Sequence, residues 1–285
     1  MEILRTVAEL RAWSRQRRKE SSSRSGATIG LVPTMGALHA GHVSLIGAAR
    51  ASSGFVAVSI FVNPTQFGPS EDFSRYPRTF AADCALAQAE GADVIFAPDA
   101  EELYPAGAAT FVEVEGLSDR LDGLSRPGHF RGVATVVTKL FIAAEPDRAF
   151  FGQKDAAQVA VIRRMTTDLR LATEIVVCPT VREPDGLAMS SRNVFLSATE
   201  RAQALTLSRA IREIEVLVTS GERRSSLLIA AARKIFVTEP AIRVDYIALI
   251  DWATLEPREI AIPGSLLAVA AYAGSTRLID NAILL

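Results

Sequence analysis

The sequence predicts an α/β fold in which a Rossmann-like domain with a parallel sheet precedes a smaller C-terminal α+β domain. Up to about residue 180, short runs rich in β-branched and aromatic residues alternate with helical patterns, which is typical of a parallel sheet with right-handed crossovers. After residue 180, two long helical patterns are followed by two or three strands. We therefore expect two domains, at 1–180 and 181–285.

The elements of the first domain follow from apolar runs and from helical spacing. The run F-V-A-V-S-I-F-V from Phe55 is uninterrupted, as expected of a strand that is buried on both faces. The segment 41–50, G-H-V-S-L-I-G-A-A-R, has its apolar residues at the spacing of one helix face. The same criteria predict strands at 28–32, 55–62, 92–96, 148–151 and 175–177, and helices at 41–50, 81–90, 133–144 and 158–169.

The second domain is predicted to begin with two helices. Ser197-Ala-Thr-Glu200 has the pattern of a capping box, in which each of the two side chains accepts a hydrogen bond from the backbone N–H of the other residue. It therefore begins a helix over 197–219, and a second helical pattern covers 222–237. Strands are expected around 244–250 and 266–272.

Composition limits the partners of the protein. Of the 285 residues, 49% are hydrophobic and 22% charged, and the net charge of −1 gives no overall field that would attract nucleic acid or anionic lipid. The N-terminal residues, interrupted by Glu2, Arg5 and Glu9, lack the apolar core of a signal peptide. Cys84 and Cys178 are far apart, which favours two buried thiols without a disulfide. We expect a cytoplasmic protein without nucleic-acid or membrane partners.

Two of the three histidines, His39 and His42, lie between the strand predicted at 28–32 and the helix predicted at 41–50. In an open α/β sheet, ligands bind beyond the carboxyl ends of the strands, where helix N-termini present free N–H groups to anions. A strand-to-helix turn that carries two imidazoles is therefore a candidate phosphate site. The alternative is that the two histidines are unrelated polar residues near a helix start.

The histidine segment, Pro33 to His42, matches neither of the common phosphate-binding loops, because it lacks both G-x-x-x-x-G-K-[ST] and G-x-G-x-x-G. Gly36 and Gly41 leave the backbone room to approach a ligand closely. The pattern His-x-Gly-His after a strand resembles the nucleotidyl-transferring α/β superfamily, in which two imidazoles contact the phosphates of ATP. We therefore expect this segment to bind nucleotide phosphates.

Three further polar clusters follow strands of the predicted sheet or lie in loops. The amides of Asn63 and Gln66 can bind hydroxyls and a carboxylate, or satisfy their own turn. Lys154 at a helix start can hold a phosphate and Asp155 can accept from ribose hydroxyls, or the two form a surface ion pair. The segment Met189-Ser-Ser-Arg192 offers donors to a diphosphate, although serine and arginine are common in loops.

Taken together, the motifs resemble one family. The blocks are P-T-M-G-A-L-H-A-G-H from Pro33, F-V-N-P-T-Q-F from Phe61, Y-P-R-T from Tyr76, R-P-G-H-F-R-G-V-A-T-V-V-T-K-L-F from Arg126, F-G-Q-K-D from Phe151, D-G-L-A-M-S-S-R-N from Asp185 and T-R-L-I-D-N from Thr276. In this order and spacing they resemble the pantothenate synthetase family over nearly the whole chain. The resemblance implies an α/β nucleotide-binding domain with a C-terminal α+β domain that closes over the site.

The resemblance implies an ATP-dependent ligase that joins (R)-pantoate to β-alanine and releases AMP and diphosphate, a step of pantothenate and coenzyme A biosynthesis. The pantoate carboxylate attacks the α-phosphorus of ATP, and the carbonyl of the bound pantoyl adenylate then accepts the amine of β-alanine. No protein nucleophile is required. ATP is expected as cosubstrate with Mg²⁺, and a homodimer is implied.

The resemblance also assigns roles to individual residues. The catalytic residues are His42, usually assigned as the proton donor, His39 and Lys154. The residues that contact ATP are Pro33, Thr34, Met35, Gly36, Ala37, Leu38, His39, Ala40, Gly41, His42, Gly152, Gln153, Lys154, Asp155, Val181, Met189, Ser190, Ser191 and Arg192. Pantoate is expected to contact Gln66, Gln158 and Met35, and β-alanine to contact Gln66.

Magnesium is expected to bind the diphosphate, whose oxygens together with waters supply most of its ligands. Asp83 is the candidate protein ligand, but Ala82 stands where the family pattern suggests a second acidic residue. The other departures from the family pattern are Ala40, Gln153 and Ala156. None of them removes a group assigned to chemistry.

His129, the third histidine, lies in the R-P-G-H block, which by resemblance borders the substrate site. A structural role is favoured for His129, and Arg126 or Arg131 is a candidate for binding phosphates or for forming part of a lid.

Two other function classes remain open on the sequence. A nucleotidylyltransferase would share the histidines and the serine-arginine loop but release a stable nucleotidyl product. A non-catalytic ATP-binding module would tolerate loss of Lys154 or Gln66. The presence of Lys154, Gln66 and Gln158 favours the ligase.

Overall fold

The computed structural model describes residues 1–21, 28–69 and 71–284. They form two compact units, Met1–Gly152 with Val161–Cys178, and Gln153–Ala160 with Pro179–Leu285. The segment Gln153–Ala160 groups with the C-terminal residues because Asn281 and Trp252 donate hydrogen bonds to its backbone carbonyls.

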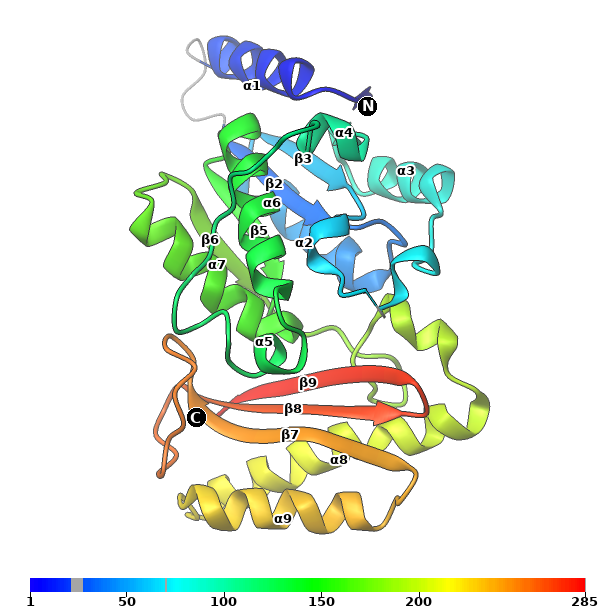
Figure 1. Ribbon diagram of the computed structural model, residues 1–285, viewed down its shortest axis with the longest axis vertical. Coiled ribbons are helices and arrows are strands. Elements are labelled where there is room, and N and C mark those ends of the chain that lie inside the picture. The colour runs from blue at the N-terminus through cyan, green and yellow to red at the C-terminus, as the bar shows by residue number, and fades with distance from the viewer. Residues whose placement is uncertain (22–27, 70, 285) are drawn as a thin grey trace. The chain divides into compact units, whose positions relative to one another are not determined.

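The first unit contains a six-stranded sheet in which all paired neighbours are parallel, as predicted. The strand order is β1-β4-β3-β2-β5-β6 (Figure 1), and the strands are β1 Glu2–Leu4, β2 Ile29–Thr34, β3 Phe55–Ile60, β4 Val94–Phe96, β5 Arg148–Gly152 and β6 Glu174–Cys178. The strand β1 was not predicted, because its three residues are exposed or half-buried and form no apolar run.

The sheet has its topological switch point between β2 and β5. These strands are neighbours, but the chain continues from β2 through β3 to β4 on one side and from β5 to β6 on the other. Ligands of open α/β sheets bind at such a point, beyond the carboxyl ends of the strands. The histidine segment leaves β2 there, and Gly152 is the last residue of β5.

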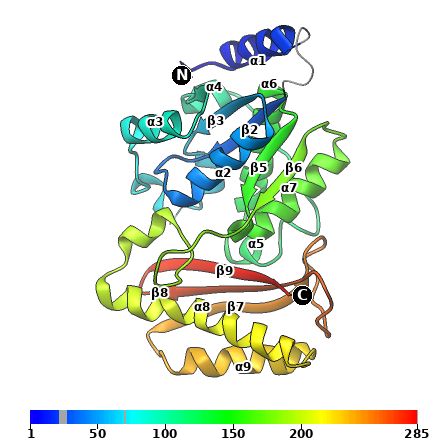
Figure 2. The ribbon, with the colours of Figure 1, turned by 180° about the vertical axis from the view of Figure 1, so that it is seen from behind.

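Helices cover both faces of this sheet. The helices α2 Ala40–Ser52 and α3 Phe80–Ala89 pack on one face, where Leu45, Ile46 and Val58 share a buried core (Figure 2). The helix α6 His129–Ala144 lies on the other face (Figure 1). The remaining helices of this part of the chain are α1 Val7–Ser21, α4 Ala100–Leu103, α5 Asp122–Ser125 and α7 Ala156–Asp168, and the short 3₁₀ turns are η1 Pro64–Gln66, η2 Asp72–Ser74 and η3 Gln153–Asp155.

Two expectations for the first unit need correction. The helix predicted at 133–144 begins at His129, because Gly128 caps it in a left-handed conformation (φ 82°) that the apolar pattern does not reveal. Cys178 is buried, but Cys84 is only half-buried. Both are free thiols, and burial raises the pKa of each, with the Asp83 carboxylate contributing at Cys84.

The second unit packs two helices against a three-stranded antiparallel sheet of order β7-β8-β9 (Figure 1). Its main elements are α8 Ala198–Thr219, α9 Ser225–Val237, β7 Ile242–Asp251, β8 Ser265–Ala273 and β9 Thr276–Leu284, and η4 Ser191–Phe195 precedes α8. The predicted capping box of Ser197 and Glu200 is present at α8. No helix within the described ranges is long and apolar enough to cross a membrane.

The helix expected from residue 222 begins at Ser225 because Glu222 holds the turn before it. Its carboxylate accepts hydrogen bonds from the backbone N–H groups of Arg223 and Arg224, both at 2.9 Å, and pairs with the Arg224 guanidinium. The bond from the Arg224 side chain, followed by the backbone bonds, lowers the pKa of Glu222 to about 2.

A glycine-to-alanine pair of variants tests the packing of α6 against η1. A Cβ at Gly132 would lie 2.3 Å from the Thr65 carbonyl oxygen, whereas one at Gly47, on the exposed side of α2, would meet nothing within 4 Å. We expect Gly132→Ala to lower the free energy of unfolding by about 2 kcal/mol or more. Gly47→Ala should raise it by about 0.5–1 kcal/mol. Equal urea midpoints for the two variants would contradict this packing.

Candidate active site

The histidine segment forms a reciprocal cap at the N-terminus of α2. The Nδ1 atom of His39, the N-cap residue, accepts a hydrogen bond from the Gly41 N–H at 3.1 Å. The Nδ1 atom of His42 in turn accepts from the His39 N–H at 3.3 Å. The two ring centroids are 4.1 Å apart. The pair is thus a capping box built from two imidazoles, a pattern that the usual S/T-x-x-E/Q signature does not reveal.

This cap determines which nitrogen of each ring can donate. Because Nδ1 accepts a backbone hydrogen bond in both histidines, we assign the neutral tautomer with the proton on Nε2. Each ring then carries an Nε2–H group that can donate to a phosphate oxygen, and the positive end of the α2 dipole favours an anion. The arrangement is suited to binding phosphate oxygens.

Asp83 on α3 holds the turn that leads into this cap. Its carboxylate oxygens accept hydrogen bonds from the N–H groups of Ala37 at 3.0 Å and Leu38 at 2.8 Å, and from the Thr79 hydroxyl at 3.0 Å. Ala37 has a φ of 50°, a conformation that is unfavourable for a residue with a side chain, and Gly36 before it has a φ of 82°. The buried carboxylate therefore stabilises a strained turn.

The residues around Asp83 do not form a Mg²⁺ site whose ligands are all protein side chains. The side chain is only 3% exposed and accepts three protein hydrogen bonds, and Ala82 beside it offers no ligand. Among the described residues there is no group of three or more histidine, cysteine or acidic side chains that could hold a metal. These contacts assign Asp83 a role in positioning the turn, and its contact with a metal bound mainly by phosphate oxygens and waters stays a prediction.

The loop after β3 that carries the amides of Asn63 and Gln66, the amide loop, contacts Met35 of the histidine segment. Gln66 in η1 is buried, and its Nε2 donates to the Met35 sulfur at 3.0 Å. The Nδ2 of Asn63 donates to Gln66 Oε1 and to the Gly132 carbonyl, both at 3.1 Å. Asn63 also caps η1 through its Oδ1, so it satisfies the turn while Gln66 is held beside Met35.

A second network holds the backbone of Gln66. The Nδ1 of His129 lies 2.8 Å from the Gln66 carbonyl oxygen, and its Nε2 lies 3.0 Å from Arg126 Nη1. His129 thus donates through Nδ1 and accepts through Nε2, which matches the structural role favoured for it. The Arg126 guanidinium binds Glu71 with two hydrogen bonds of 2.7 Å. Burial opposes this ionisation, but the Arg126 bonds prevail and lower the pKa of Glu71.

Both arginines of the block that begins R-P-G-H-F-R contact other side chains of the first unit. Arg126 is engaged by Glu71, and the Arg131 guanidinium stacks on Phe111 at 3.8 Å from the ring centroid. Glu71 was missed in the sequence because a single acidic residue in a Pro/Gly-rich loop carries no signal of its partner.

In the second unit, Lys154 lies in η3 beside Asp155. The Lys154 ammonium is 3.5 Å from an Asp155 carboxylate oxygen, and the two side chains are 20% and 46% exposed. An exposed pair at this distance contributes little stability, so it does not account for the placement of the lysine. Gln158 follows on α7 and is half-buried.

In the same unit, Val181 and the segment 189–192, both expected to contact ATP, are linked by a backbone hydrogen bond. The Met189 N–H donates to the Val181 carbonyl at 2.9 Å, so the two ends of the loop are adjacent. Ser190 caps η4, which begins with Ser191 and Arg192, by accepting from the Arg192 N–H at 3.3 Å. Asp280 and Asn281 of β9 contact this loop and the Lys154 segment respectively. Neither was assigned a role from the sequence, although both lie in the T-R-L-I-D-N block.

The predicted site residues fall into one group in each unit. Pro33 to His42, Gln66 and Asp83 belong to the first unit, in which Gly152 ends β5. Lys154, Asp155, Gln158, Val181 and the segment 189–192 belong to the second.

Replacing Asp83 with asparagine separates the two roles considered for it. Asp83→Asn presents an N–H group to backbone donors, so we expect a loss of about 1–3 kcal/mol in unfolding free energy. The loss should be the same in excess Mg²⁺ and in chelator. Thr79→Val, which removes only the hydroxyl donor, should lose less. A loss for Asp83→Asn that appears only with Mg²⁺ would favour the metal-ligand role.

Comparison with known proteins identifies relatives over the whole chain. The family model described as pantoate-beta-alanine ligase matches residues 2–283. A pantothenate synthetase of Acidobacterium capsulatum is 59% identical over 285 residues, which cover 98% of this chain and 95% of the relative. The crystal structure of pantothenate synthetase from Thermus thermophilus has a TM-score of 0.92, 44% identity and 99% coverage of both chains.

The description of a further solved structure names bound ligands. It is the pantoate-beta-alanine ligase of Francisella tularensis, described as complexed with beta-gamma ATP and beta-alanine. Its TM-score is 0.76 at 32% identity, and the match covers 99% of this chain and 97% of that one. The chain described here belongs to the pantoate-beta-alanine ligase family and is an enzyme of that class.

Proposed function

We propose that this enzyme condenses (R)-pantoate with β-alanine in an ATP-dependent reaction that releases AMP and diphosphate through a pantoyl adenylate. Family membership over nearly the whole chain supports the reaction class. The observation that carries the proposal is the 3.0 Å contact between Gln66 and Met35. It joins the amide loop, suited to a small hydroxy acid, to the histidine segment, suited to phosphates.

The first step requires that a carboxylate approach a triphosphate of like charge, so the site must neutralise charge and hold the reactants in line. We assign the Nε2–H groups of His39 and His42 to phosphate oxygens, with Pro33 to His42 along the nucleotide. A neutral imidazole donates a hydrogen bond to the developing charge without losing its proton. His42 is the principal catalytic residue in this scheme, and His39 positions the nucleotide.

The other group of residues is assigned to the departing diphosphate and the nucleoside. Lys154 and Arg192 supply positive charge and Ser190 and Ser191 supply hydroxyl donors to the diphosphate. Asp155 and Gly152 are assigned to the nucleoside, and Val181 to the adenine through its backbone.

Gln66, Gln158 and Met35 are assigned to pantoate, and Gln66 also to β-alanine. The fixed amide of Gln66 can bind hydroxyl and carboxylate groups without adding charge. Mg²⁺ is proposed to enter with ATP, where it neutralises phosphate charge through phosphate oxygens and waters. The family resemblance further supports a homodimer in the cytoplasm.

Isotope exchange distinguishes this function from the two other classes. We expect exchange of labelled diphosphate into ATP that depends on pantoate, and AMP release only after β-alanine is added. A nucleotidylyltransferase would release a stable nucleotidyl product instead, and an ATP-binding module would catalyse no exchange. A folded, ATP-binding sample without pantoate-dependent exchange would exclude the ligase.

Substitution of His42 separates its catalytic role from its role in the cap. Glutamine is a usual residue at this position of a capping box, so His42→Gln should keep the unfolding free energy of the native enzyme. Single-turnover adenylation should slow by about two orders of magnitude, or ~3 kcal/mol, as for one lost transition-state donor. His42→Ala should lower both the unfolding free energy and the adenylation rate. Ser52→Ala, at the other end of α2, should lower neither. Near-normal adenylation by His42→Gln would refute the assignment.

A further inference from the structure

Two adjacent residues of β9, Asp280 and Asn281, have no part in the function proposed above. Both are polar and buried, with exposures of 3% and 4%. Consecutive residues of a strand point to opposite faces of the sheet. Asp280 shares the face of Leu278 and Ala282, which belong to the helix-packed core, and Asn281 lies on the other face.

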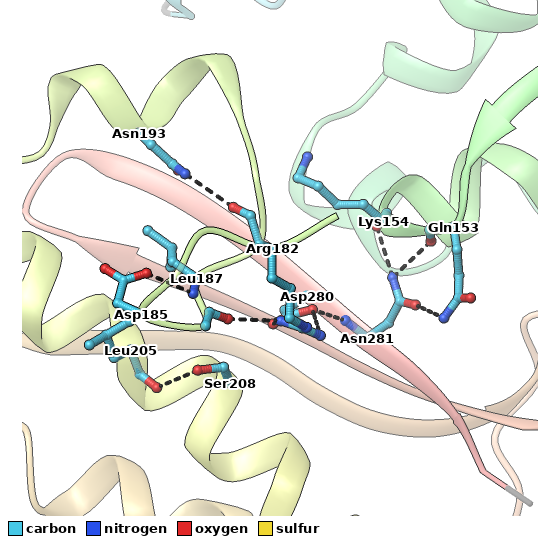
Figure 3. A network of polar contacts seen from close by, with 12 residues as sticks. Gln153, Lys154, Arg182, Asp185, Leu187, Asn193, Leu205, Ser208, Asp280 and Asn281 are labelled. Carbon is cyan, nitrogen blue, oxygen red and sulfur yellow. Dashed lines mark hydrogen bonds and ion pairs between the residues drawn. The ribbon is translucent and has the colours of Figure 1, made fainter. Parts of the chain in front are cut away.

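Asn281 binds the segment that carries Lys154. Its Nδ2 donates to the carbonyl oxygens of Gln153 at 3.0 Å and Lys154 at 2.8 Å (Figure 3). Its Oδ1 accepts from Gln153 Nε2 at 3.1 Å. Both amide hydrogens and the amide oxygen are therefore used on one short turn, and buried hydrogen-bond groups are costly to leave without a partner.

Asp280 binds the neighbouring loop on the opposite face. Its two oxygens accept from Arg182 at 2.6 and 3.0 Å, a bidentate pair (Figure 3). Arg182 also donates to the Gly186 carbonyl at 3.1 Å, inside the loop that joins Val181 to Met189. Asp280 further accepts from the backbone N–H of Asn281 at 2.8 Å, which orients the Asp280 carboxylate.

We propose that Asn281 is a positioning residue for Lys154 in the adenylation step. This inference rests on the proposed role of Lys154 at the departing diphosphate. A lysine side chain is flexible, and ordering it is entropically costly. Fixing the carbonyls of Gln153 and Lys154 sets the direction in which the Lys154 side chain leaves the backbone. The Trp252 indole supports the start of α7, directly after this turn, by donating to the Ala156 carbonyl at 2.9 Å.

The substitution Asn281→Asp tests the proposal with little change in volume. A carboxylate cannot donate to the two carbonyls, so the turn should loosen. A matched control is Asp245→Asn, which removes the ion pair of 2.8 Å to Arg277 in the same sheet. We expect both variants to lose thermal stability. Only Asn281→Asp should lower kcat/KM for ATP in pantoate-dependent exchange, by about tenfold or more, with the KM for β-alanine unchanged.

A double-variant cycle with Lys154→Ala shows whether Asn281 acts through the lysine. The kinetic effect of Asn281→Asp should disappear when Lys154 is already alanine. The inference is overturned if Asn281→Asp leaves kcat/KM for ATP as unchanged as Asp245→Asn should. It is also overturned if Asn281→Asp lowers kcat/KM for ATP to the same extent in the Lys154→Ala enzyme. If Lys154→Ala exchanges normally, the proposed role of Lys154 itself fails. Should Asn281→Asp not fold, Asn281→Ala, which buries no charge, replaces it with the same expected results.

Discussion

The reciprocal hydrogen bonds between His39 and His42 are the constraint on which the first group of site residues depends. They begin α2 at the switch point of the sheet, and they commit the Nδ1 atom of both rings to the backbone. The Nε2–H groups are thereby directed to donate. The cap in turn needs the left-handed turn at Ala37, which the buried Asp83 carboxylate stabilises. Local folding and the proposed phosphate binding thus use the same side chains.

Buried polar side chains hold the other site residues in a similar way. Asn63 binds the side chain of Gln66, and His129 binds the backbone carbonyl of the same residue. Asn281 binds the backbone at Lys154. In each case a buried polar side chain makes several hydrogen bonds to a loop and fixes a neighbour that is assigned to substrate. Such networks are rigid when every member is satisfied, which is what preorganised binding requires.

The strands and helices with strong periodicity were predictable from the sequence, as was the position of the histidine turn. The buried run at β3 and the capping box at Ser197 are examples, because both signals are local. The hydrogen-bond partners of Glu71, Asp83 and Asn281 were not predictable. Their partners lie 55, 46 and 127 residues away in the chain, so no local pattern contains them. For Asp83 the family resemblance suggested a metal, and a lone carboxylate carries no sign of its hydrogen-bond donors.

In the proposed reaction, a pantoate carboxylate displaces diphosphate from ATP before the amide forms. Pantoate labelled with a heavy oxygen isotope in its carboxylate tests it most directly. Attack on the α-phosphorus places one carboxylate oxygen in the bridge to phosphorus, and the amine then displaces AMP at the carbonyl carbon. We therefore expect labelled AMP after one turnover. Label in the diphosphate, or label retained entirely in the carboxylate and amide products, would contradict it.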